Sequence, residues 1–146
     1  DRRVFVADSF EGLPPPDLAK YPQDRGDKHY KQRFLAVSRE EVEEHFRLYG
    51  LLDDQVVFLE GWFAETLPAA PIDRLAVMRL DGDMYGSTMD AMTALYPKLS
   101  DGGFCIIDDY ALPNCRKAVD DFRAEHAIAS PVVEIDWSGV FWRKGE

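Results

Sequence analysis

Short apolar runs separated by polar segments set the pattern of this chain. Each run is bounded by charged or turn-forming residues, and the runs occupy residues 4–7, 56–59, 75–80 and 104–107. Runs of this length and with these boundaries are typical of buried strands. The sequence therefore predicts four strands that belong to one sheet.

Helical spacing of apolar residues occurs between these runs. Residues 38–50 begin with Ser38 and Glu41 at the spacing of a capping box and close at Gly50, so they predict an amphipathic helix. Further helical segments are predicted at residues 64–71, 87–99 and 114–126. Pro97 should end or distort the helix in which it lies, because proline lacks the backbone N–H that the helix needs.

The alternation of strands and helices predicts an α/β fold with a mainly parallel sheet. The tail, residues 132–144, is predicted to form two strands around a tight turn at Ser138-Gly139 and should add an antiparallel hairpin. Residues 9–31 are rich in proline, glycine and charge, which predicts a long loop or lid. We expect one domain over residues 1–146, incomplete at its N-terminus.

Composition and charge exclude several partners. The formal net charge is −10 and the isoelectric point is near 4.7, with no basic stripe to neutralise phosphates, so nucleic acid is not an expected partner. No apolar run approaches the roughly 20 residues that span a bilayer, and the N-terminus has no signal-peptide layout. Two cysteines imply no disulfide framework. We expect a cytoplasmic protein with no membrane partner.

Acidic residues follow the predicted strands: Asp8, Glu60, Asp81 and the pair Asp108-Asp109. One such acid is commonplace, since aspartate often caps the helix after a strand. Ligands, however, gather at the carboxyl ends of parallel strands, and packed carboxylates repel one another unless a cation or a shared proton intervenes. The three histidines lack the spacing of a zinc site, and oxygen ligands favour Mg²⁺ or a similar ion.

Several longer motifs resemble a known family. They are "VFVADSFEGLP", "GWFAETLP", "RLDGDMYGSTMDAMTALYPKLSDGGFCIIDDY", "CRKAVDDFR" and "IDWSGVFWR", and together they cover nearly the whole chain. They resemble the macrocin O-methyltransferase family, whose members methylate sugar hydroxyls of bacterial natural products with S-adenosylmethionine (SAM) and Mg²⁺. The resemblance implies a Rossmann-like SAM-methyltransferase sheet, a glycosylated small-molecule substrate and a homo-oligomer.

The resemblance also implies roles for individual residues. The implied metal ligands are Asp81, Asp108 and Asp109, and Asp81 is in addition the implied general base. The implied cofactor-binding residues are Asp8 and Ser9 near the ribose, and Gly61 and Trp62 near the adenine. The loop at residues 29–37 matches a region that closes over the sugar acceptor. Asp83 either supports the metal ligands or caps the following helix.

One departure from the family pattern concerns the N-terminus. Only seven residues precede Asp8, so the first strand and the Gly-rich turn that approaches the methionine part of SAM are absent. We expect the C-terminal portion of a longer enzyme, which on its own would bind SAM weakly. The sequence does not name the acceptor sugar, the hydroxyl methylated or the size of the oligomer.

Two other functions remain open at this point. Asp81-Gly82-Asp83 is a D-x-D pattern, with which many glycosyltransferases hold a metal and a nucleotide sugar, although it leaves Asp108 and Asp109 unexplained. The chain could alternatively be a non-catalytic fragment of a methyltransferase fold that serves as a binding module. Binding of SAM would distinguish a methyltransferase from a glycosyltransferase. Measured turnover would distinguish a methyltransferase from a non-catalytic fragment.

Overall fold

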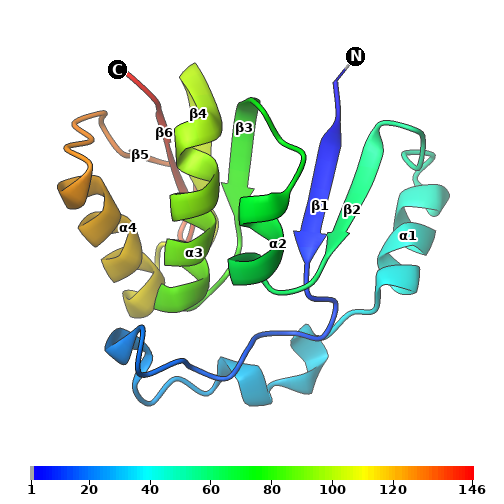
Figure 1. The fold of residues 1–146 in the computed structure, drawn as a ribbon, viewed down its shortest axis with the longest axis horizontal. Coiled ribbons are helices and arrows are strands. Elements are labelled where there is room, and N and C mark those ends of the chain that lie inside the picture. Colours follow the sequence, from blue (N-terminus) through cyan, green and yellow to red (C-terminus); the bar gives the residue numbers. More distant parts are fainter. Residues whose placement is uncertain (1) are drawn as a thin grey trace. The chain divides into compact units, whose positions relative to one another are not determined.

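The computed structural model describes residues 2–146, which fall into two units (Figure 1). The first unit comprises the described residues up to Pro15 together with Lys28–Ala70, and the second comprises Pro16–Asp27 and Pro71–Glu146. Each unit is described by itself. One domain over residues 1–146 stays a prediction.

The first unit is built on two parallel strands, β1 (Val4–Asp8) and β2 (Val56–Glu60). Their register runs from Val4 opposite Val56 to Asp8 opposite Glu60, so both strands end at the same edge. The short helix α2 (Phe63–Ala69) packs against both strands. Both predicted strands are confirmed, and α2 lies where a short helical turn was expected.

The helix α1 (Arg39–Leu48) confirms the predicted capping pattern. The Ser38 hydroxyl accepts a hydrogen bond from the Glu41 backbone N–H at 3.3 Å, which satisfies a donor that the first helical turn leaves free. Gly50 follows the helix with a φ of 66°, a left-handed conformation that glycine adopts without strain. Phe46 packs edge-on against Phe58 of β2, with ring centroids 6.0 Å apart.

The second unit contains a four-stranded sheet in the order β3-β4-β6-β5. Its strands are β3 (Leu75–Leu80), β4 (Leu99–Ile107), β5 (Val133–Glu134) and β6 (Val140–Arg143). β3 and β4 are parallel, whereas β6 runs antiparallel to both β4 and β5. The predicted C-terminal hairpin is therefore confirmed as β5–β6.

Two helices, α3 (Tyr85–Leu95) and α4 (Pro113–Glu125), cover one face of this sheet (Figure 1). The largest side chains buried beneath them include Trp142, Phe122, Met92 and Ile107. A 3₁₀ turn at Tyr96–Lys98 replaces the last turn of the predicted helix, so Pro97 ends α3 as expected. No helix among residues 2–146 is long and apolar enough to cross a bilayer.

Strand β4 begins earlier than its apolar run predicted. Leu99 pairs with Leu75 and Phe104 pairs with Val77, so a β-bulge in β4 takes up the extra residues between these two pairs. Gly102 has a φ of 74° within this bulge. Glycine suits this position because the bulge needs a left-handed backbone conformation that residues with a side chain rarely adopt.

The predicted α/β order with parallel strands and an antiparallel C-terminal hairpin is confirmed, whereas the described strands fall into two hydrogen-bonded sheets rather than the one expected. Among the described residues, β1 pairs with β2 and β3 pairs with β4, and no ladder joins these two pairs. The sheet of the second unit is also mixed, because its two further pairings are antiparallel. The order of strands and helices along a chain indicates strand direction, but it does not specify which edges share hydrogen bonds.

Candidate functional site

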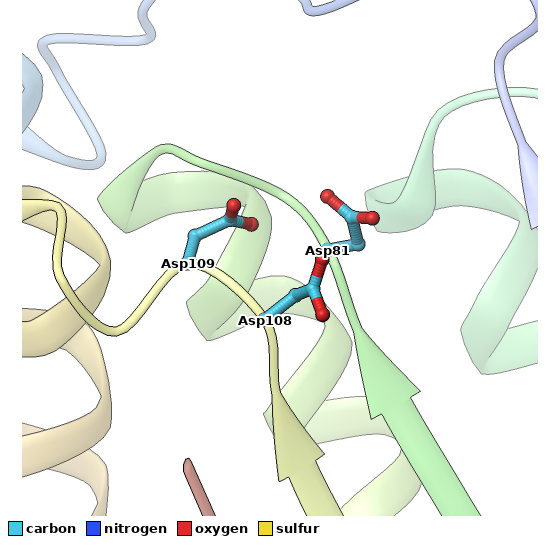
Figure 2. Close-up of side chains that lie close together, drawn as sticks. All are labelled: Asp81, Asp108 and Asp109. Atoms are coloured by element: carbon cyan, nitrogen blue, oxygen red, sulfur yellow. The ribbon is translucent and has the colours of Figure 1, made fainter. Parts of the chain in front are cut away.

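Three aspartates converge at the carboxyl ends of β3 and β4. Leu80 pairs with Ile107, so the next residues along these parallel strands, Asp81 and Asp108, are neighbours, and Asp109 follows directly. One carboxylate oxygen from each of the three lies within 4.8 Å of the others. Figure 2 shows these side chains at the strand ends. We call Asp81, Asp108 and Asp109 the carboxylate trio.

A guanidinium lies beside two members of the trio. Arg79 Nη2 is 2.7 Å from Asp108 Oδ2 and 3.3 Å from Asp81 Oδ2. With the three carboxylates ionised, the formal charge of the group is −3 + 1 = −2, which a divalent cation would balance. The Asp81 side chain is about half-exposed at 52%, so water and ions can reach the trio. Charge, ligand type and spacing therefore all fit a hard divalent cation.

Crowding of the carboxylates changes their protonation. Burial, together with repulsion from Asp109 and Asp108, raises the pKa of Asp81 to about 6, despite the opposing charge of Arg79. Burial and the nearby Asp83 likewise raise the pKa of Asp109. At neutral pH, Asp81 is thus ionised but holds a proton more readily than an ordinary aspartate. Such a group can take up a proton near the operating pH of an enzyme.

A strained turn connects β3 to α3 and holds Asp109. Asp83 has a φ of 54°, which is uncommon for a residue with a side chain, and the Met84 N–H donates to Gly82 O at 2.5 Å across it. In this conformation the Asp83 backbone N–H donates to Asp109 Oδ2 at 3.2 Å. The backbone of Asp83 thus supports a trio member, while the role of its side chain stays a prediction.

The cap of α3 comes from a residue that sequence reasoning missed. Asp24 is 1% exposed, and its carboxylate accepts hydrogen bonds from the backbone N–H groups of Tyr85 and Gly86, both at 2.8 Å. These two bonds explain why α3 begins at Tyr85 rather than at the predicted Ser87. Nothing near α3 in the sequence announces this contact, because Asp24 belongs to the segment predicted as a lid.

In the first unit, the expected cofactor residues form a turn after β1. Asp8 Oδ1 accepts the Phe10 N–H at 2.7 Å, and Phe10 has a φ of 58°. The Ser9 hydroxyl donates to Gly12 O at 2.6 Å and accepts the Glu11 N–H at 3.1 Å. The Asx hydrogen bond uses one oxygen of Asp8, and the carboxylate offers a second to a ligand.

The other two expected cofactor residues lie next to this turn. The Gly61 N–H donates to Asp8 O at 2.9 Å, which places Gly61-Trp62 beside the end of β1. Gly61 has a φ of 134°, and a Cβ there would lie only 2.7 Å from Thr66 Cγ2, so a side chain is excluded. Trp62 is the N-cap residue of α2. All four residues thus meet within the first unit, and their cofactor role stays a prediction.

The remaining strand-end acid, Glu60, and two of the histidines, His45 and His126, lie outside the trio. Glu60 lies 3.3 Å from Arg39 Nη1 and is not part of the trio. His126 stacks on Phe122 with ring centroids 4.0 Å apart, and His45 lies in the last turn of α1. None of these three side chains belongs to the group of possible metal ligands found among the described residues.

Comparison with known proteins agrees with this geometry. The chain is 57% identical over 143 residues to the 8-demethyl-8-(2,3-dimethoxy-alpha-L-rhamnosyl)-tetracenomycin-C 4'-O-methyltransferase of Streptomyces olivaceus, covering 97% of the chain and 55% of that protein. It is 51% identical to the mycinamicin III 3''-O-methyltransferase of Micromonospora griseorubida, covering 99% of the chain and 58% of that protein. The chain therefore spans a little over half the length of these relatives.

A solved structure and a family model complete the comparison. The structure of the O-methyltransferase NovP matches with a TM-score of 0.95 and 52% identity, covering the whole chain and 61% of NovP. The fold is therefore an α/β methyltransferase fold. The model of the macrocin-O-methyltransferase (TylF) family matches residues 1–144. On this evidence, the chain belongs to the macrocin-O-methyltransferase family.

Proposed function

We propose that this chain is part of a SAM- and Mg²⁺-dependent O-methyltransferase that methylates a sugar hydroxyl of a glycosylated natural product. The observation that carries the proposal is the carboxylate trio at adjacent strand ends in a member of this family. The relatives above support the substrate class, because they are O-methyltransferases that act on tetracenomycin and mycinamicin compounds.

The trio would hold the metal ion and receive the proton. Asp108 and Asp109 each offer a carboxylate oxygen, and the Asp83 N–H orients Asp109. Asp81, whose pKa is raised to about 6, is ionised at neutral pH and would accept the proton of the acceptor hydroxyl. Bound Mg²⁺ would act as a Lewis acid and stabilise the negative charge that develops on the hydroxyl oxygen as its proton leaves.

The turn after β1 would hold the cofactor. The free lone pairs of the Asp8 carboxylate can accept the two ribose hydroxyls, while the bond to Phe10 keeps the side chain in place. Ser9 holds the turn closed through Gly12. The turn at Gly61, where a side chain would collide with Thr66, leads directly to Trp62, whose ring would stack on the adenine. SAM would supply the methyl group.

Methyl transfer by the full-length protein encoded by this reading frame tests the proposal. The protein is incubated with SAM and glycosylated tetracenomycin or mycinamicin acceptors, and products are analysed by mass spectrometry. We expect a singly methylated product, loss of turnover with chelator, and recovery with Mg²⁺. SAM binding without turnover on any acceptor would favour the non-catalytic alternative, and transfer of a sugar from a nucleotide sugar would favour the D-x-D alternative.

Two further expectations concern the whole protein. We propose a homo-oligomer, which light scattering coupled to size-exclusion chromatography would detect, and a cytoplasmic location, which cell fractionation would test. A monomer in solution would contradict the first expectation without affecting the methyltransferase proposal.

A further inference from the structure

The buried carboxylate of Asp24 has no part in the chemistry proposed above. Fully buried aspartates are rare unless their oxygens are hydrogen-bonded, because desolvation of the charge is costly. Asp24 meets this condition with Tyr85 N–H and Gly86 N–H, and it also accepts the side-chain amide of Asn114 at 3.2 Å. One side chain thus joins the starts of α3 and α4.

The segment that carries Asp24, residues 20–27, is fastened along α3, and we call it the strap. The Tyr21 hydroxyl donates to Asp90 Oδ1 at 2.5 Å, and Lys20 Nζ lies 2.8 Å from the same oxygen. The Tyr21 ring packs on Gly86, where a Cβ would come within 2.7 Å of Tyr21 Cδ2. The strap therefore has two separate attachments along α3, one at its N-terminus through Asp24 and one further along at Asp90. Asp24 and Asp27 also contact Asn114 of α4.

The attachment at Asp24 lies two residues beyond the strained turn of the trio. Tyr85, whose N–H donates to Asp24, directly follows Met84 in the chain. The Met84 N–H in turn donates to Gly82 O and closes the turn at Asp83. A left-handed conformation at a residue with a side chain persists only where the surroundings hold it. Met84 is 2% exposed, so the turn is held by burial on one side and by Asp24 on the other.

We propose that Asp24 is a positioning residue of the carboxylate trio. By fixing the N–H groups of Tyr85 and Gly86, it keeps the Asp83 turn in the conformation that carries Asp81 and orients Asp109. The inference rests on the proposed function, in which the trio binds Mg²⁺. A cap that served stability alone would change unfolding but leave metal affinity as it was.

The test is Asp24→Asn in the full-length protein. The amide has nearly the same shape but replaces one acceptor oxygen with a donor, which would face a backbone N–H. We expect the dissociation constant for Mg²⁺, measured by calorimetry without SAM, to rise about 10–100-fold, the range typical of residues that orient metal ligands. Turnover at saturating Mg²⁺ should fall much less, because Asp24 touches none of the trio oxygens among the described contacts.

Asp90→Asn is the matched control. It makes the same substitution at the other attachment of the strap, so it should lower the unfolding temperature but leave the Mg²⁺ dissociation constant unchanged. Unchanged Mg²⁺ affinity in folded Asp24→Asn, or equal weakening in both variants, would overturn the inference and leave the proposed function standing. A wild-type protein that binds no Mg²⁺ would overturn both.

Asn114→Ala provides a second route if Asp24→Asn does not fold. It removes one donor to Asp24, together with the 3.4 Å contact of the same amide with Asp27, and it keeps the Asp24 carboxylate on α3. We therefore expect a smaller rise in the same dissociation constant. No rise in this variant would then count as the result that overturns the inference.

Discussion

The two parallel strand pairs of this chain end alike in sequence and differently in structure. At the end of β1–β2, Asp8 and Glu60 are register partners, yet each has its own local contact: Asp8 with the Phe10 N–H and Glu60 with Arg39. At the end of β3–β4, Asp81 and Asp108 are likewise neighbours, but a third carboxylate converges on them.

The difference shows what turns acidic strand ends into a candidate metal site. A carboxylate with a nearby donor is satisfied where it stands, whereas crowded carboxylates with one guanidinium keep an excess of negative charge. The extra member, Asp109, is held by the backbone of the Asp83 turn rather than by a cation of the protein. Position at a strand end is therefore not sufficient to make an acidic residue part of a candidate metal site.

The largest effect is expected from Asp81→Asn, which keeps the shape and one ligand oxygen but removes the charge and the proton acceptor. Turnover of the full-length enzyme should fall about 10²–10⁴-fold, the usual cost of losing a general base, and excess Mg²⁺ should not restore it. Glu60→Gln makes the same change at the other strand pair and should retain turnover. Near wild-type activity of Asp81→Asn at saturating Mg²⁺ would show that the base lies elsewhere.

Asp109→Asn should have a large effect that metal can reverse. The amide oxygen remains a possible ligand, but the loss of charge weakens the attraction for a divalent cation, so half-maximal activity should need about 10–100 times more Mg²⁺. Saturating Mg²⁺ should bring back most of the turnover, in contrast to Asp81→Asn. A Mg²⁺ titration of initial rates measures both quantities, and an unchanged midpoint would remove Asp109 from the set of ligands.

Asp8→Asn should weaken SAM binding at the turn after β1 without changing Mg²⁺ binding at the trio. Its amide oxygen can still accept the Phe10 N–H, so the turn should survive, while the charged acceptor for the ribose is lost. Because hydrogen bonds to charged groups contribute about 1.5–3 kcal/mol, the dissociation constant for SAM should rise about 10–100-fold. Calorimetry should find Mg²⁺ affinity unaltered, and a parallel loss of Mg²⁺ binding would contradict independent sites.

The smallest expected effect is on the stability of the metal-free protein. The pKa of Asp81 is about 6 when folded against 3.8 as its ordinary value, so the folded state binds the proton more tightly. The resulting stabilisation is fully present below the ordinary pKa and is lost as pH rises through about 6. Because Asp81 is half-exposed, the change should be about 1 kcal/mol.

Thermal unfolding without metal between about pH 4 and pH 7 measures this effect as a difference between variants. Wild type should lose stability relative to Asp81→Asn as pH rises, and Mg²⁺ should restore it. The Glu60→Gln variant should follow wild type, because Glu60 lies beside Arg39 rather than beside other carboxylates. Parallel curves for wild type and Asp81→Asn would show that the trio is not crowded in solution.

The sequence by itself determined most of the helices and strands, and it marked the strand ends at which a ligand could bind. Apolar runs marked β1, β2 and β3 closely, because burial between helices selects continuous apolar residues. Ser38 and Glu41 marked the start of α1, since a cap is a contact between residues three apart. The pairing of Asp81 with Asp108 also followed, because parallel neighbours end at the same edge.

Only the tertiary structure decided the features that depend on distant segments. The left-handed turn at Asp83 and the cap of α3 by Asp24 left no periodic signal in the sequence. Asp24 lies in a segment whose composition reads as a loop, yet it is almost fully buried. Local patterns report which face of an element is apolar, whereas the partner of a buried donor depends on where the rest of the chain packs.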